Sequence, residues 1–139
     1  MTDEHTVDEL LGAILNQVLD LLYQAKQAAW SATQSPLRSD LQELVTYLIE
    51  QSRVVMEAEE RIDGRAPDIA SPSSHQRGNI VADANGDIRV ATSVLVDRLD
   101  ALADDVRARA ATMPAGGDAT MLAELSDGLA RRRDRLRSD

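Results

Sequence analysis

The sequence of 139 residues has no cysteine and no phenylalanine, and it has only one tryptophan and two tyrosines. Without cysteine, the chain has no disulfide, no thiolate zinc site and no thiol nucleophile. It also has no apolar run of about eighteen residues, so we expect no transmembrane helix. The first residues, MTDEHTVDE, are acidic and do not form a basic leader followed by an apolar stretch, so the simplest expectation is a cytoplasmic location.

Positive charge is also scarce. The chain has 24 acidic and 15 basic residues, a net charge of -9, and Lys26 is its only lysine. Because contacts to phosphate need Lys and Arg, an acidic chain of this kind is a poor general binder of nucleic acid. What is abundant is aliphatic: 43% of the residues are hydrophobic and almost none are aromatic. This composition is typical of a helical bundle, and the length fits one domain over residues 1–139.

Apolar residues recur at helical spacing in four segments, at about 7–30, 36–63, 87–112 and 119–137. Thr6 and Glu9 match a capping box at the start of the first segment. Ser35 followed by Pro36 is a typical start for the second, and Asp118 is a candidate cap for the fourth. No convincing strand is predicted.

Residues 65–86 have a different character from the rest of the chain. They include Pro67, Pro72 and a Ser-rich stretch, and they predict a long connection with one short helix inside it. A bundle with a single long link between its second and third helices has the ferritin-like topology. The sequence therefore predicts an all-α, ferritin-like four-helix bundle with a long crossover between helices two and three.

Two patterns suggest metal binding but do not complete a site. Asp83, Asn85 and Asp87 alternate like the first ligands of a calcium loop, but Ile88 stands where that loop needs glycine and no acid closes it. We interpret this stretch as a turn followed by a helix cap. The two histidines, His5 and His75, form no His-x-x-x-His or Glu-x-x-His motif, so we expect both to be solvated.

The stretch EAEER carries three carboxylates, Glu57, Glu59 and Glu60. Helical periodicity puts Glu60 in line with the inner stripe that includes Leu48 and Met56, so Glu60 is a candidate metal ligand. It is equally placed to pair with an arginine or to lie at the wet edge of the stripe. Because no second ligand is evident, the structural interpretation is favoured.

Five of the arginines crowd into the stretch RRRDRLR: Arg131, Arg132, Arg133, Arg135 and Arg137. Cations at the end of a helix interact favourably with its dipole, and this is the favoured interpretation. The alternative is a patch that contacts phosphate or DNA. Arg132 or Arg133 interrupts the apolar stripe, so this helix is expected to be only partly buried or to pack on a neighbour.

The stretch LLYQAKQAAW, residues 21–30, resembles the first-helix signature of the Dps family of mini-ferritins, in which Lys-Gln-Ala precedes His-Trp. AEERIDGRAP, residues 58–67, is similar to the end of that family's second helix. The spacing between the two stretches matches the family without a gap. The resemblance implies a hollow shell of twelve subunits, oxidation of ferrous iron by peroxide, storage of ferric mineral and, in many members, protection of DNA.

The same resemblance implies a di-iron site between two subunits, and most of its ligands are missing here. The family's first histidine position is Ala29, and its second histidine and following aspartate fall at Leu41 and Val45. The last two ligands, an aspartate and a glutamate, fall at Met56 and Glu60. Iron needs oxygen and imidazole donors, and only Glu60 offers one. Iron is therefore a cofactor by resemblance only, with Glu60 as the one matching position.

The leading hypothesis is a Dps-like protein without ferroxidase activity that has a structural, sequestering or partner-binding role as a homo-oligomer, either a dimer or a dodecameric shell. The alternative is an iron-storage and DNA-protection ferroxidase with an unconventional site that uses Glu60 with Glu57 or Glu59. A third hypothesis is co-assembly with an intact, paralogous Dps subunit. DNA binding is expected to be weak or absent, because the family's Lys-rich N-terminal tail is replaced by acidic residues.

Overall fold

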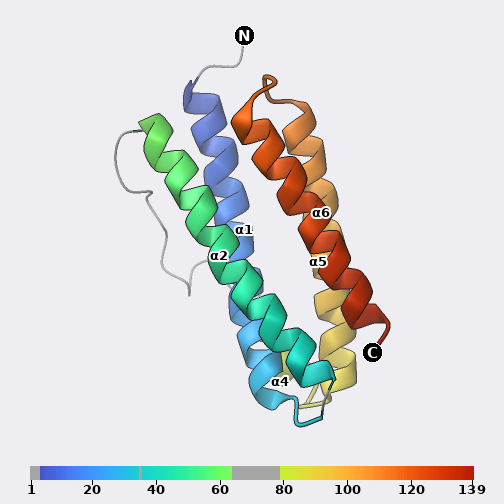
Figure 1. Cartoon of the computed structure of the whole chain (residues 1–139). Helices are drawn as coiled ribbons and strands as arrows, with labels where there is room; N and C mark the ends of the chain where they lie inside the picture. Colours follow the sequence, from blue (N-terminus) through green and yellow to red (C-terminus); the bar gives the residue numbers. More distant parts are fainter. Residues whose placement is uncertain (1–3, 35, 64–78) are drawn as a thin grey trace.

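The computed structural model describes residues 4–34, 36–63 and 79–139, and within these ranges all regular structure is helical. Ser35 and His75 lie outside the described residues, as does the side chain of His5. The helices are α1 (Glu4–Ser31), α2 (Leu37–Asp63), the short α4 (Ile80–Asp83), α5 (Ile88–Ala111) and α6 (Gly117–Arg137) (Figure 1).

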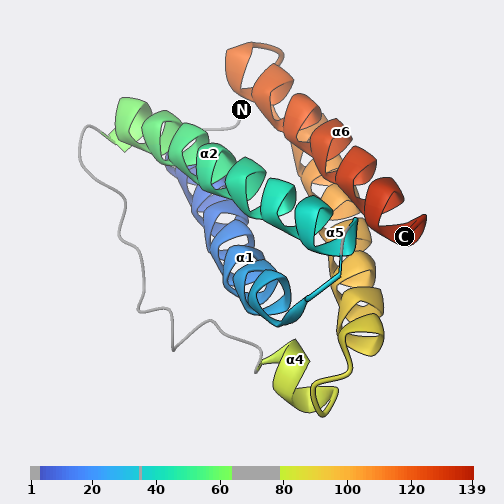
Figure 2. The same cartoon turned by 60° about the horizontal axis from the view of Figure 1, so that its bottom comes forward.

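The four long helices form two antiparallel pairs. α1 packs chiefly on α2, and α5 packs chiefly on α6; the pairs meet through α1 against α5 and α2 against α6 (Figures 1 and 2). α2 ends at one end of the bundle, whereas α4 and the start of α5 lie at the other end, so α2 and α5 run in the same direction. One long crossover between the second and third long helices is the ferritin-like arrangement, so the predicted fold class is confirmed.

Local capping explains where α4 and α5 begin. The side chain of Asn79 accepts hydrogen bonds from the N–H groups of the first turn of α4, and that of Asp87 does the same for α5. Between them, Asn85 (φ 53°) and Gly86 (φ 78°) are in the left-handed region that these two residue types tolerate. The stretch from Asp83 to Asp87 is therefore a turn and a cap, as the sequence predicted, and α4 is the short helix expected within residues 65–86.

The predicted starts of α1 and α6 are wrong in detail. α1 already begins at Glu4, so the backbone of Thr6 lies inside the helix and not before its first residue. α6 begins at Gly117, and the residue before it has no side-chain capping bond. Asp118 lies in the first turn, where a carboxylate still interacts favourably with the helix dipole.

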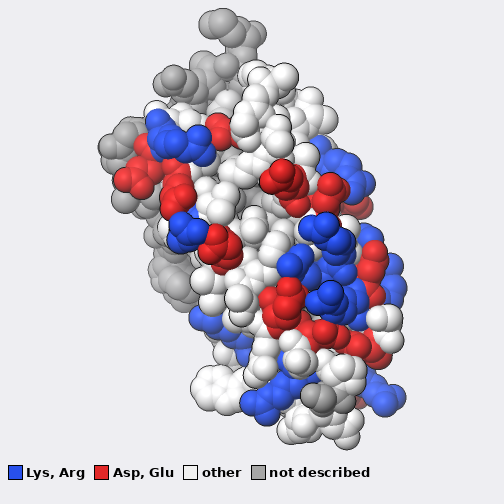
Figure 3. All heavy atoms as spheres, in the orientation of Figure 1, with Lys and Arg blue, Asp and Glu red and all other residues white. Residues whose placement is uncertain are grey.

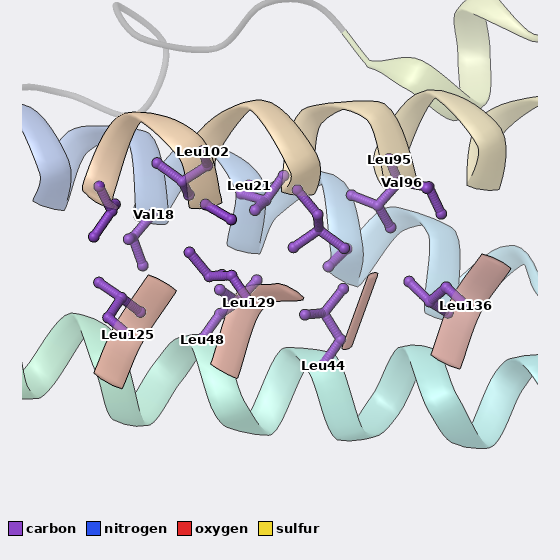
Figure 4. Packing of buried hydrophobic residues seen from close by; sticks show 14 of the residues in the cluster. Val18, Leu21, Leu44, Leu48, Leu95, Val96, Leu102, Leu125, Leu129 and Leu136 are labelled. Atoms are coloured by element: carbon purple, nitrogen blue, oxygen red, sulfur yellow. The ribbon is translucent and has the colours of Figure 1, made fainter. Parts of the chain in front are cut away.

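The core is almost wholly aliphatic and runs the length of the bundle. Leucines and valines from all four long helices point into one interior, and fully burying each contributes about 1.5–3 kcal/mol (Figure 4). The largest fully buried side chains are those of Leu11, Ile14, Leu15, Gln24, Leu41, Leu44, Leu48, Leu95, Leu99, Leu122, Leu125 and Leu129.

The one polar side chain in that set, Gln24, connects α1 to the crossover. Its Oε1 atom accepts a hydrogen bond from the backbone N–H of Ile80 at 3.0 Å. Ile80 opens α4 and is itself buried. The bond therefore fixes the point at which the chain re-enters the bundle after the crossover. Across the described residues, every helix is too short or too polar to cross a membrane.

Candidate functional site

The five positions at which the Dps family has iron ligands lie on α1 and α2. Ala29 and Leu41 are core residues, with 7% and 0% of their surface exposed. Val45 and Met56 are half-buried and pack against that core. Four of the five positions therefore carry hydrocarbon that takes part in packing, and none of the four offers an oxygen or nitrogen donor to iron.

Glu60, the fifth position, is exposed, so its predicted place on the inner stripe of α2 is wrong. The buried carboxylate is that of the preceding residue, Glu59, which is 6% exposed. Because each residue turns about 100° round a helix, the two side chains face different directions. Glu59 faces α1: its Oε2 atom is 3.7 Å from the position that a Cβ atom on Gly12 would occupy.

Glu57 points in a third direction and forms an ion pair at the surface. Its Oε1 atom accepts a hydrogen bond from Arg53 at 2.8 Å, and Arg53 also pairs with Glu50. These side chains are more than half exposed, so the pairs contribute little stability. Arg61 pairs across the bundle with Asp118 at 3.4 Å.

The three carboxylates of this stretch, Glu57, Glu59 and Glu60, therefore diverge. Within the part of the chain that the structure describes, no group of three His, Cys, Asp or Glu side chains is placed to hold a metal ion. The donor set at the family's positions does not fit a di-iron centre, because one exposed carboxylate cannot replace two histidines and three acids.

A partly apolar face occupies the same side of α2 as Glu60. Val45, Ile49, Met56 and Glu60 follow one another at spacings of four, seven and four residues, which places them on one face of the helix. Ile49 is 49% exposed. Trp30, in the last turn of α1, is 82% exposed. Contiguous exposed apolar surface is typical of sites that contact a partner.

The arginine run of α6 is largely engaged within the chain. Arg132 pairs with Glu43 at 2.9 Å, Arg133 with Asp100 and Asp134, and Arg135 with Glu43 at 3.7 Å. For Arg131 and Arg137, the described residues provide no ion-pair partner. Figure 3 shows the basic side chains over α6 interspersed with acidic ones, so this surface is not a continuous basic patch.

Arg132 also has a packing role that was not predicted from the sequence. It follows Leu125 and Leu129 at a stripe position of α6, and its guanidinium carbon lies 3.6 Å from the centroid of the Tyr47 ring. Burial raises the pKa of the Tyr47 hydroxyl, and the nearby charge of Arg132 opposes that shift. The sequence feature that could have indicated this contact is a charged residue at an apolar stripe position of α6. A long side chain can cover apolar surface there while its charged end stays in a polar environment.

Two hollows on the surface were also not predicted. A small one of about 160 Å³ is lined by Arg131, Arg132 and Arg135. A larger one of about 990 Å³ is lined by residues where α1 turns into α2, where α5 begins and where α6 ends. These segments lie at the same end of the bundle (Figure 1). Neither could be found from periodicity, because each is formed by residues distant from one another in the sequence or by side-chain packing.

A scan against protein-family models and a search of the curated proteins each found no match to this chain.

Proposed function

We propose that this chain is a ferritin-superfamily protein similar to the Dps mini-ferritins that lacks ferroxidase activity. Its role is structural, sequestering or partner-binding, and it acts in the cytoplasm as a homo-oligomer. The observation that carries this proposal is the state of the family's ligand positions. Ala29 and Leu41 are built into the core and Val45 and Met56 pack against it, so the metal site is replaced as a unit by apolar contacts.

That replacement is internally consistent. A single lost ligand would leave the other polar ligands buried without a metal, which is costly. Here the hydrocarbon side chains need no such partner, and the packing of α1 on α2 continues through the positions where ligands would stand. Glu60 remains exposed at the edge, where a carboxylate is hydrated without cost.

The exposed apolar face supports the oligomeric part of the proposal. Trp30 of α1 and Ile49 of α2 are large exposed apolar side chains, and Val45 and Met56 extend the side of α2 on which Ile49 lies. The family's di-iron positions lie between two subunits, and here that region is apolar. A second copy of this chain, or a paralogous Dps subunit with intact ligands, is the partner that this face fits.

The first test is an iron oxidation assay. Metal-free protein is mixed with ferrous iron and peroxide, and ferric absorbance is followed in the wild type, in Glu60→Ala and in the matched surface control Glu50→Ala. We expect all three to oxidise iron at the rate of buffer alone. Faster oxidation that is lost in Glu60→Ala and kept in Glu50→Ala would establish the alternative, a ferroxidase with an unconventional site.

The second test measures the oligomeric state by size-exclusion chromatography with light scattering. We expect the wild type to be a dimer or a larger shell at micromolar concentration, and Trp30→Ser with Ile49→Ser to shift it toward the monomer. Val90→Ser is the matched control, because Val90 is also 49% exposed but lies on α5. A monomeric wild type would overturn the homo-oligomer, and co-elution with an added Dps subunit would then favour co-assembly.

A further inference from the structure

The turn between α4 and α5 exposes two residues whose chemistry the proposed function does not use, Asn85 and Gly86. Both have a positive φ, of 53° and 78°, and both are exposed. A Cβ atom built on Gly86 would meet no atom beyond its chain neighbours within 4 Å, so water reaches this part of the backbone. The side-chain amide of Asn85 forms no hydrogen bond within the described part of the chain. This amide is therefore available to react with the next backbone nitrogen.

An asparagine followed by glycine converts spontaneously to aspartate or isoaspartate. The deprotonated backbone nitrogen of Gly86 attacks Cγ of Asn85, the bond from Cγ to the side-chain nitrogen breaks, and ammonia leaves. Because glycine has no Cβ, no side chain shields its nitrogen from this reaction. Water then opens the succinimide ring at either carbonyl. Opening at Cγ gives aspartate, and opening at the main-chain carbonyl gives isoaspartate, whose main chain is longer by one carbon.

The folded turn restrains the attacking nitrogen. The N–H of Gly86 donates to the carbonyl of Val81 at 2.9 Å, and that of Asn85 donates to the carbonyl of Ala82 at 3.0 Å, which is the pattern of a Schellman motif. Ring closure needs a deprotonated nitrogen at Gly86 and rotation of the Asn85 backbone, and both hydrogen bonds oppose these changes. The reaction therefore requires α4 to open first. α4 is only four residues long, so we expect it to open locally while the bundle stays folded.

We propose that Asn85 is a site of spontaneous deamidation whose rate is set by the opening of α4. The product alters the junction between the crossover and α5. The N–H of Asp87 donates to the carbonyl of Ala84 at 3.0 Å, and the Asp87 side chain accepts from the N–H of Arg89 to cap α5. Isoaspartate at position 85 lengthens the main chain between Ala84 and Asp87, so this turn and cap cannot persist unchanged. The modification does not depend on the proposed absence of ferroxidase activity.

The test is a time course of the full chain at mildly alkaline pH, followed by peptide mass spectrometry with fragmentation that distinguishes isoaspartate from aspartate. We expect deamidation at Asn85 in the folded chain, and a rate about tenfold or more higher in urea, where α4 is open. Asn79 and Asn16 are internal controls. Ile80 follows Asn79 and Gln17 follows Asn16, so a side chain stands beside each attacking nitrogen. Both controls should stay unmodified in the folded chain over the same period.

Gln24→Met tests the role of α4 directly. It removes the side-chain oxygen that accepts the N–H of Ile80 at the start of α4, so we expect deamidation at Asn85 to accelerate several-fold. Gln27→Met is the matched control and should react like the wild type. Asn16 of α1 should stay unmodified in Gln24→Met, which distinguishes an opened α4 from general unfolding.

Three results would overturn the proposal. A folded wild type that leaves Asn85 unmodified would remove the site. Equal rates at Asn85 in the folded chain and in urea would show that the turn does not restrain the reaction. Equal rates in Gln24→Met and Gln27→Met, or a rise in Gln24→Met that Asn16 shares, would show that opening of α4 does not set the rate.

Discussion

Arg132 of α6 stacks over the ring of Tyr47 of α2, with its guanidinium carbon 3.6 Å from the ring centroid. The ring in turn lies against the backbone of α6, and its hydroxyl donates to the carbonyl of Leu125 at 3.3 Å. Arg132 also donates to a carboxylate oxygen of Glu43 at 2.9 Å and to the carbonyl of Gly128 at 3.1 Å. These contacts join the two antiparallel helix pairs where the apolar stripe of α6 is interrupted.

The close approach of Tyr47 to α6 requires glycine at position 128. A Cβ atom there would lie 1.9 Å from the tyrosine Oη and 2.6 Å from its Cζ, far inside van der Waals contact. We expect Gly128→Ala to lower the free energy of unfolding by about 1–3 kcal/mol, even though alanine favours a helix over glycine by about 1 kcal/mol. Urea unfolding of the two proteins measures the difference.

Gly12→Ala is the matched control for that substitution. The nearest atom to its added Cβ is Oε2 of Glu59 at 3.7 Å, an ordinary contact, so we expect alanine to be neutral or stabilising at position 12. In a Tyr47→Leu background, Gly128→Ala should lose most of its penalty, because the atoms it overlaps are gone. A penalty unchanged in that background would show that the tyrosine is not its cause.

The stability of the fold should decline at alkaline pH through Tyr47. Burial raises the pKa of this hydroxyl above its ordinary value of 10.0, so the folded chain keeps the proton at a pH where the unfolded chain has lost it. Its contribution is therefore fully present below about pH 10 and is lost as the pH rises toward the folded pKa. Urea unfolding at a series of pH values should show this decline in the wild type.

Tyr47→Phe should remove this alkaline decline while lowering stability at neutral pH by about 0.5–1.5 kcal/mol for the lost hydrogen bond. Tyr23→Phe is the matched control and should leave the decline in place. If Tyr47→Phe and the wild type lose stability equally with rising pH, the assignment to Tyr47 is wrong.

Much of the fold could be predicted from the sequence because helix positions follow from periodicity, and the crossover follows from proline and polar residues. The faces of α2 were harder to predict. Leu41, Leu48, Val55 and Glu59 are separated by seven, seven and four residues, so Glu59 continues the buried stripe. Periodicity fixes which residues share a face, but the width of the covered strip depends on how α1 approaches α2. The packing of α1 on α2 therefore determines that Glu59 is buried and Glu60 is exposed.

The site could be predicted only in part, and for a physical reason. That Ala29, Leu41 and Val45 offer no iron donor follows from residue type alone. The larger hollow at the end of the bundle could not be predicted from residue type, because its wall joins three segments that are distant in the sequence. The stacking of Arg132 could not be predicted either, because nothing in the sequence shows that Tyr47 lies beneath it.

Glu43 should limit the affinity of the arginine run for DNA. Its two carboxylate oxygens lie 2.9 Å from Arg132 and 3.7 Å from Arg135, so it offsets the positive charge of both residues. We expect Glu43→Gln to bind duplex DNA more tightly than the wild type at low salt, with a salt dependence steeper by about one unit of slope. Fluorescence anisotropy of labelled DNA across a salt series measures both quantities.

Glu124→Gln is the matched control for the DNA experiment, because it removes the same charge from an exposed position on α6 that has no arginine partner among the described residues. Equal gains in Glu43→Gln and Glu124→Gln would mean that net charge alone controls binding. A gain confined to Glu43→Gln would assign the effect to the released arginines.

Gln24 should control how firmly the crossover is attached to the bundle. Its Oε1 atom accepts the hydrogen bond from the N–H of Ile80 at 3.0 Å, whereas the capping side chain of Asn79 serves the next two N–H groups of α4. Gln24→Met keeps the length and helix propensity of the side chain but leaves the buried N–H of Ile80 without its acceptor. We expect a loss of about 1–3 kcal/mol in stability, concentrated at α4.

Native-state hydrogen exchange should therefore accelerate at the amide of Ile80 far more than at that of Leu95 in the core of α5. The half-buried Gln27, replaced by Met, is the control and should leave both amides unchanged. Equal acceleration at Ile80 and Leu95 would mean that Gln24 supports the whole bundle and has no special role in holding the crossover.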